Sequence, residues 1–224
     1  DALVGAIASG AKWDKKDLAG TYFQEEKAGL ARMGQPDTAV VLAPAAFFLE
    51  HAESLKLTAK LGGAMKGREA TESWALVAKK GALPNAAALD GWTVASLAGF
   101  SPRFVKGALA GWGKLPETVK FQQSGQILSL MRKAAKGEKV AILMDGEQVA
   151  ALASAPQAAQ LEVVHKTPAV PSAVVATVAG RLPDAKWKAL CDAMLKLGDT
   201  PDGAKALEGV QKLKFVPLDE KALA

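Results

Sequence analysis

The sequence predicts an α/β protein with two lobes, and three observations support this prediction. Short strand-like runs alternate with helix-like stretches along the 224 residues, which is typical of βαβ units. The run KVAILMDG at 139–146 is nearly all apolar, as expected for a parallel strand covered on both faces. The segment 163–178, VVHKTPAVPSAVVATV, joins two Val-rich runs through two prolines and no glycine. A tight hairpin normally needs Gly or Asn at its turn, so this segment is expected to connect two parts of the molecule.

The first part of the chain is expected to alternate strands and helices as far as residue 81. The expected strands are 2–7, 37–44, 56–62 and 73–81. A helix is expected to begin near Asp17, a good N-cap residue, and to end at Gly34. Pro44 closes its strand and suits the first position of a following helix.

The alternation continues to the end of the chain. Strands are expected at 91–99, 118–122, 139–146 and 213–219. Ser101-Pro102 has the cap-then-proline order that begins a helix. Further helical segments are expected around 127–134 and 147–154, from Pro183 to Gly198, and after the cap Thr200-Pro201-Asp202.

The proline-rich segment also predicts how the chain divides into lobes. Strands 73–79 and 163–178 flank a self-sufficient block of three strand–helix units. We therefore expect one lobe from 1–80 and 171–224 and a second, inserted lobe from 81–170. The two crossings are expected to form hinges near 75–82 and 163–172, with a ligand-binding cleft between the lobes.

Composition and charge exclude several classes of protein. The formal charge of +5 comes from lysines scattered among acids, with no dense basic block, so a nucleic-acid partner is not expected. No apolar run approaches the roughly 18 residues of a membrane span. The chain does not open with a basic region and an apolar stretch, so an export signal is expected to have been removed or never to have existed. Cys191 is the single cysteine, which excludes an internal disulfide.

Motifs for cofactor or phosphate chemistry are missing from the sequence. No segment fits the P-loop pattern, and no G-x-G-x-x-G follows a predicted strand. The two histidines and the cysteine have no recognisable metal-ligand spacing. The sequence therefore predicts no cofactor, no metal and no assembled catalytic trio.

The carboxyl ends of the predicted strands indicate where a ligand would bind, because open α/β sheets bind ligands beyond those ends. The loop 96–103 is the strongest candidate, since a helix start and a guanidinium attract anions. The nine predicted ligand-binding residues are Ser9, Ser73, Trp74, Ser96, Phe100, Ser101, Arg103, Asp145 and His165.

Five of these candidates have a structural alternative that the sequence leaves open. Ser101 would cap its helix, and Arg103 would point to water. Asp145 would stabilise a helix start. His165 would hydrogen-bond within the hinge, and Trp74 would brace it. Unlike Trp74, three further tryptophans are expected in the core, namely Trp92, Trp112 and Trp187.

Four stretches resemble the phosphate/phosphite/phosphonate-type solute-binding proteins of ABC importers, which have the two-lobed type II periplasmic binding fold. They are VVLAPAAFFLEH, LDGWTVASLAGFSPR, GEKVAILMDGEQVAALA and DTPDGAKALEGVQKLKFVPLD. The resemblance runs in order over nearly the whole chain. Two positions depart from the family pattern: 96-SLAGFS-101 replaces a Ser-Thr-Ser-type phosphate loop, and Val140 stands where an acidic residue is common.

The resemblance implies a non-catalytic, monomeric solute-binding protein of the periplasm or cell envelope that delivers a small molecule to a membrane permease. The departures imply a ligand other than phosphonate, either anionic or partly apolar. Two alternatives remain open at this point. One is a carrier or sensor for a ligand or lipid with a non-ABC partner. The other is an enzyme on the same fold, with His165, Asp145 or Glu147 as the reactive residue.

Overall fold

A computed structural model describes residues 2–65, 69–218 and 223. The chain divides into two compact units, which are residues 1–71 with 171–224 (unit 1) and residues 72–170 (unit 2). Residues 72–80 therefore lie in unit 2 and not with the first lobe, because their strand pairs with a strand of unit 2, Ala75 opposite Met144. No helix in the described part of the chain combines the length and apolar character needed to cross a bilayer.

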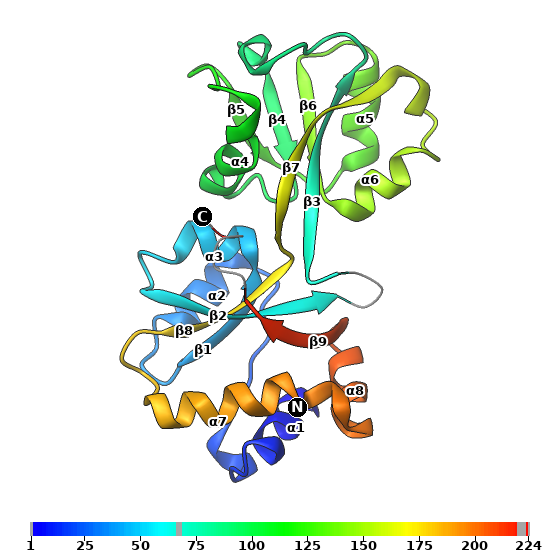
Figure 1. Cartoon of the computed structure of the whole chain (residues 1–224). Coiled ribbons are helices and arrows are strands. Elements are labelled where there is room, and N and C mark those ends of the chain that lie inside the picture. Colours follow the sequence, from blue (N-terminus) through cyan, green and yellow to red (C-terminus); the bar gives the residue numbers. More distant parts are fainter. Residues whose placement is uncertain (1, 66–68, 219–222, 224) are drawn as a thin grey trace. The chain divides into compact units, whose positions relative to one another are not determined.

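Unit 1 contains a four-stranded sheet of order β1-β8-β2-β9 (Figure 1). Its strands are β1 (Val40–Pro44), β2 (Leu57–Met65), β8 (Ala173–Val178) and β9 (Lys212–Pro217). Its helices are α1 (Ala2–Gly10), α2 (Glu26–Met33), α3 (Ala45–His51), α7 (Asp184–Leu195) and α8 (Pro201–Glu208), with 3-10 turns at Lys15–Asp17 and Leu197–Asp199.

Both faces of this sheet are covered, because alternate residues of β8 enter two different cores. Val175 packs with residues of α1, α7 and α8, among them Ile7, Leu190 and Leu207. Val174 and Ala176 face the other way and pack with α3. Every strand pair in the unit is antiparallel. The α/β fold class is confirmed, whereas the sheet of unit 1 is antiparallel and not parallel or mixed, because β8 runs opposite to β1 and β2, and β2 runs opposite to β9.

Residues 2–7 belong to helix α1, which corrects the strand expectation. The run is short and apolar, and such runs fit a strand or a buried helix equally well. In the structure Leu3, Ile7 and Ala11 all pack into one core, the spacing of a helical stripe. Ser9 therefore stands in the last turn of a helix, exposed, and does not follow a strand.

The expected helix from Asp17 to Gly34 is shorter than predicted. Asp14 caps a 3-10 turn that ends at Asp17, residues 18–24 have no regular structure, and α2 begins only at Glu26. Gly20 lies close to α1 in this segment, and a Cβ there would lie 2.4 Å from Cγ2 of Val4.

Unit 2 contains a mixed five-stranded sheet of order β5-β4-β6-β3-β7 (Figure 1). Its strands are β3 (Thr71–Lys79), β4 (Thr93–Ser96), β5 (Lys120–Gln123), β6 (Val140–Met144) and β7 (Leu161–Pro171). Its helices are α4 (Pro102–Leu109), α5 (Ile127–Ala135) and α6 (Gly146–Leu152), with 3-10 turns η2 (Ala86–Leu89), η3 (Ala110–Trp112) and η4 (Ala158–Gln160).

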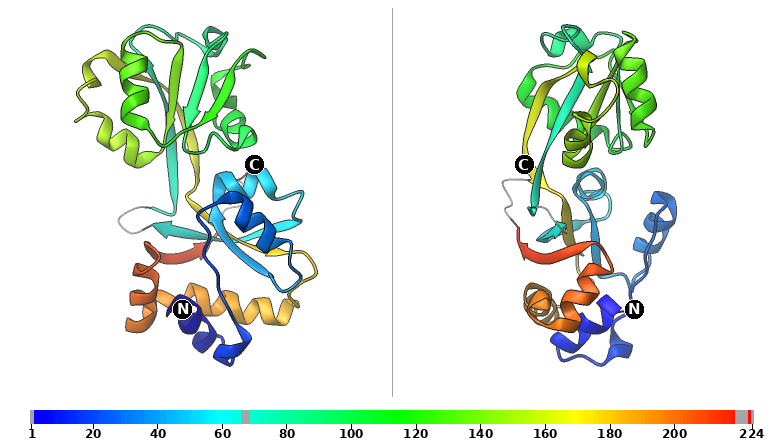
Figure 2. Two further views of the ribbon diagram at one scale, coloured as in Figure 1. Left: turned by 180° about the vertical axis from the view of Figure 1, so that it is seen from behind. Right: turned by 90° about the vertical axis from the view of Figure 1, so that its right-hand side faces the viewer.

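The parallel strands β4, β5 and β6 form the centre and one edge of this sheet. Residues 141–144 are completely buried, which confirms a strand covered on both faces. The α5–α6 side holds Val77, Ala95 and Ile142. The α4 side holds Trp74, whose ring meets that of Phe104 edge-on at 5.0 Å. Figure 2 lets the reader follow these helices from two further directions.

Candidate functional site

The carboxyl ends of β4, β5 and β6 lie at one edge of the unit 2 sheet, because the three strands are parallel. We call this the carboxyl edge; it comprises the loop 97–101, the loop 124–126 and Asp145. β3 is antiparallel to β6, with Ala75 opposite Met144, so β3 begins at the same edge. The edge therefore brings together six of the nine predicted residues, namely Ser73, Trp74, Ser96, Phe100, Ser101 and Asp145, with Arg103 in the first turn of α4.

Ser96 and Ser101 are completely buried. The Ser96 hydroxyl accepts the N–H of Ala98 at 3.1 Å, and the Ser101 hydroxyl accepts the N–H of Phe104 at 3.1 Å. The second bond is the N-cap of α4, the structural alternative that the sequence left open. In this conformation neither side chain reaches solvent, and contact of their hydroxyls with a ligand stays a prediction.

Backbone N–H groups of the loop 97–101 are also used within unit 2. Gly99 donates to the carbonyl of Ser96 at 3.1 Å, and Ser101 donates to that of Ala98 at 2.9 Å. The carbonyl of Ser96 also accepts the N–H of Ser124 at 2.9 Å, which ties the loop to the chain beyond β5. A loop that cradles phosphate must aim several such donors at the anion. Here the N–H groups of Ala98, Gly99 and Ser101 point elsewhere.

Gly99 allows the loop to lie directly against β5. A Cβ at this position would stand 2.1 Å from the carbonyl oxygen of Gln122. The loop is thus pressed onto the neighbouring strand, and the residue at its outer side is Leu97, which is 43% exposed.

Two leucines that the sequence analysis did not select stand exposed at the carboxyl edge. Leu97 follows β4, and Leu128, in the first turn of α5, is 58% exposed. Leu97 also covers the loop after β5, since a Cβ on Gly125 would lie 3.5 Å from its Cδ2. The signal was present in the sequence, because Leu97 occupies the position next to Ser96 in the loop selected as the strongest candidate.

Asp145 caps helix α6. Its carboxylate accepts the N–H of Gln148 at 2.9 Å, and the Gln148 side chain accepts the N–H of Asp145 at 3.3 Å. This reciprocal pair is a capping box. Glu72, at the start of β3, accepts the N–H of Gly146 at 3.3 Å. The capping alternative for Asp145 is what the structure shows, and Glu72 is a neighbour that sequence reasoning missed.

His165 lies away from the carboxyl edge, in the middle of β7. Its ring stacks on that of Trp112 at a centroid distance of 5.9 Å, and its Nε2 atom is buried without a hydrogen-bond partner among the described residues. Trp112 is 53 positions earlier in the chain (165 − 112), so no local pattern predicts the pair. The side chain is partly exposed, and the expected contact of His165 with a ligand stays a prediction.

Trp74 has a bracing role in unit 2. Its backbone N–H donates to Thr167 Oγ1 at 2.9 Å, which connects β3 to β7, and its ring contacts Phe104 of α4. The ring remains partly exposed. Ser73 is exposed on the opposite face of β3, and Arg103 is exposed at the start of α4.

The pKa shifts of two groups in unit 1 bear on reactivity. Burial raises the pKa of the Cys191 thiol, helped by the nearby Asp192 carboxylate, so the thiol stays protonated at neutral pH. A hydrogen bond from Arg32 lowers the pKa of the Asp37 carboxyl, which is exposed. No group of three His, Cys, Asp or Glu side chains in the described residues is arranged to hold a metal ion.

The fold of two α/β units, each with a helix-covered sheet, is that of the type II periplasmic binding proteins. A family model described as "ABC transporter, phosphonate, periplasmic substrate-binding protein" matches residues 30–223. The chain belongs to this family of periplasmic substrate-binding proteins of ABC transporters, which is the family that the sequence motifs resemble. No curated protein matches the chain in sequence.

Solved structures share the fold at low sequence identity. XAC2383 from Xanthomonas citri bound to ATP is 14% identical with a TM-score of 0.70, covering 99% of this chain and 87% of that one. A binding protein component of an ABC phosphonate transporter from Pseudomonas aeruginosa is 17% identical with a TM-score of 0.59, covering 99% and 76%. PhnD1 from Prochlorococcus marinus, in complex with methylphosphonate, is 14% identical with a TM-score of 0.59, covering 99% and 87%.

Proposed function

We propose that this substrate-binding protein captures a small ligand with a substantial apolar part and, at most, one anionic group. The observation that carries the proposal is that, in the loop after β4, polar side chains are buried and an apolar side chain is exposed. Its two serines are completely buried, whereas Leu97 beside them is 43% exposed. A phosphonate needs several hydrogen-bond donors, but both hydroxyls of this loop are buried and three of its N–H groups donate within the chain.

The contribution of unit 2 to binding is proposed to combine an apolar surface with one cation. Leu97, Leu128 and the partly exposed Phe100 would contact the apolar part. Arg103 would pair with an anionic group, since its guanidinium can make two parallel hydrogen bonds to a carboxylate or phosphate. Trp74 offers a partly exposed aromatic face at the same edge.

Ligand identity is tested by native mass spectrometry of the protein purified from its own host, followed by thermal-shift measurements with defined compounds. We expect a retained molecule with an apolar body, and we expect methylphosphonate to leave the melting temperature unchanged. A ligand present at 100 times its Kd raises the free energy of unfolding of the protein by about 2.7 kcal/mol. A tight binder will therefore raise the melting temperature measurably. Micromolar binding of methylphosphonate would contradict the proposal.

Arg103→Ala is expected to weaken binding of an anionic retained ligand by about tenfold or more, because one charge-assisted pair is lost. Isothermal titration calorimetry of the variant and the parent protein provides the measurement. Arg132→Ala, an exposed arginine in the last turn of α5, is the matched control and should bind like the parent. Unchanged affinity in Arg103→Ala removes this residue from the site.

Leu97→Asn with Leu128→Asn is expected to weaken binding of the same ligand by about tenfold, because the substitutions remove apolar contact surface at two exposed positions. Their exposure means that folding should survive, which circular dichroism can verify. Val210→Asn, at an exposed valine of unit 1, is the control. A ligand that binds the double variant as tightly as the parent does not lie on these leucines.

We also propose that the protein is a monomer without catalytic activity. Two of the three candidate reactive residues have structural contacts: Asp145 caps α6, and His165 stacks on Trp112. The Cys191 thiol is also kept protonated by burial. Light scattering tests the monomer, and mass analysis of the bound ligand after incubation tests for turnover. A ligand that is converted during incubation would overturn the second part.

A further inference from the structure

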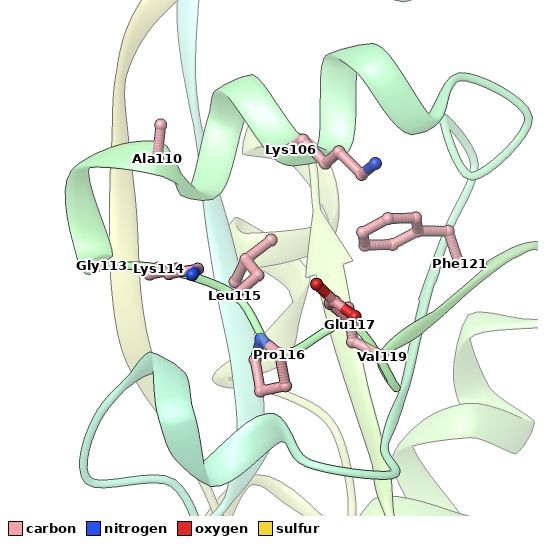
Figure 3. A pocket seen from close by; sticks show the side chains of 9 residues that line it. All are labelled: Lys106, Ala110, Gly113, Lys114, Leu115, Pro116, Glu117, Val119 and Phe121. Atoms are coloured by element: carbon pink, nitrogen blue, oxygen red, sulfur yellow. The ribbon is translucent and has the colours of Figure 1, made fainter.

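Unit 2 contains a pocket of about 660 Å³ that is separate from the carboxyl edge (Figure 3). Its walls are the second half of α4, the turn η3, the segment 113–119 and the first residues of β5. β5 begins at Lys120 and reaches the carboxyl edge only at Gln123, so the pocket lies toward the opposite ends of these strands. The residues that line it are Lys106, Ala110, Gly113, Lys114, Leu115, Pro116, Glu117, Val119 and Phe121.

The lining combines apolar and charged side chains, and all nine lining residues are partly or fully exposed. Figure 3 shows Leu115 pointing from the segment 113–119 toward α4, and Phe121 reaching in from β5. Lys106 comes from α4, whereas Lys114 and Glu117 come from the segment that faces it. All three charged residues are exposed, and none of them forms a salt bridge with another described residue. The charged groups of the lining sum to one positive charge.

The walls of the pocket are held in place by contacts that need no ligand. Gly113 has φ +135°, a backbone conformation that a side chain would disfavour, and it turns the chain from η3 into the segment 114–119. Trp112, the residue before it, is stacked on His165. At the far end the N–H of Val119 donates to the carbonyl of Pro116 at 3.3 Å. A preformed pocket binds with a smaller loss of conformational entropy than one that must be ordered.

We propose that this pocket is a second binding site, for a small amphiphile with an apolar body and a singly charged carboxylate head. Its volume falls within the range of about 300–1,000 Å³ that is common for small-molecule sites. The apolar body would lie against Leu115, Val119 and Phe121, and the carboxylate would pair with Lys106 and Lys114. Glu117 sets the charge of the head, because a second negative charge on the ligand would be repelled by its carboxylate.

Titration of the ¹⁵N-labelled protein with octanoate tests the site by NMR. Saturable shifts are expected at the backbone amides of Lys106, Ala110, Leu115 and Phe121, and not at those of the loop 97–101. Octylammonium and inorganic phosphate are the comparison probes, and both should bind more weakly than octanoate. Shifts that do not saturate, that concentrate at the loop 97–101, or that are as large with octylammonium would overturn the proposal.

Variants make the test specific to the two lysines. The double variant Lys106→Gln with Lys114→Gln should weaken octanoate binding about fivefold, the effect expected for two exposed ion pairs. Lys120→Gln removes the same charge from a neighbouring position whose side chain points to the other face of β5, and it should bind like the parent. Equal affinities in all three proteins would exclude the carboxylate contact. Because the reporting amides differ from those of the carboxyl edge, failure here leaves the proposed ligand site untouched.

Discussion

Gly99→Ala is expected to destabilise unit 2 by about 3 kcal/mol, since overpacking a tight contact costs up to that amount. The added Cβ would stand 2.1 Å from the carbonyl oxygen of Gln122 and 2.6 Å from the N of Gln123. These are backbone atoms of β5, held by parallel pairing with β4, so they cannot rotate away as a side chain would. The loop 97–101 must move off the strand instead.

Urea unfolding followed by tryptophan fluorescence measures the loss, and hydrogen exchange at 96–101 shows whether the loop has lifted. Gly107→Ala is the matched control. This glycine lies inside α4, and a Cβ added to it would have nothing within 4 Å, so alanine should stabilise the helix by roughly 0.5–1 kcal/mol. A Gly99→Ala protein as stable as the parent would show that the loop does not lie against β5.

Arg181→Gln is expected to destabilise unit 1 by about 2 kcal/mol, because hydrogen bonds to a charged group are worth about 1.5–3 kcal/mol. Nη1 of Arg181 donates to the carbonyl oxygens of Met33 at 2.6 Å, Gln35 at 2.8 Å and Thr38 at 3.0 Å. These carbonyls lie between the last residue of α2 and the start of β1, and that of Gln35 also accepts the N–H of Thr38 at 3.2 Å. Glutamine is too short to reach all three.

The measurement is again urea unfolding, with hydrogen exchange at 33–38 as the local readout. Arg132→Gln serves as the control, because this arginine is exposed at the end of α5 and its loss should change stability by no more than about 0.5 kcal/mol. A loss of that same small size in Arg181→Gln would mean that the segment between α2 and β1 is held by other contacts.

Local chemistry accounts for the elements that the sequence predicts well. Ser101-Pro102 and Thr200-Pro201 combine a capping hydroxyl with a proline, and each pair begins a helix in the structure. The all-apolar run 140–144 forms the central strand of unit 2. Errors occur where a short apolar run has no such signal, as at 2–7.

The candidate site likewise has features that the sequence predicts and features that it does not. Sequence patterns selected the loop 96–103 and its position beyond a strand, because the order of strands and helices places such loops at one edge of a sheet. They could not tell which way each side chain in the loop points. Ser96 was selected for its hydroxyl and is buried, whereas Leu97 was passed over and is exposed.

The sequence by itself determined the α/β fold class, since caps, prolines and apolar runs act over a few residues and can be read in order. The class of protein came from the resemblance of four stretches to a known family. Only the tertiary structure decided which groups are available to a ligand. The burial of Ser96 and Ser101, the stacking of Trp112 on His165 and the pocket beside Phe121 depend on residues that meet across the fold. These contacts form when distant parts of the chain pack together, and no periodic pattern in the sequence predicts them.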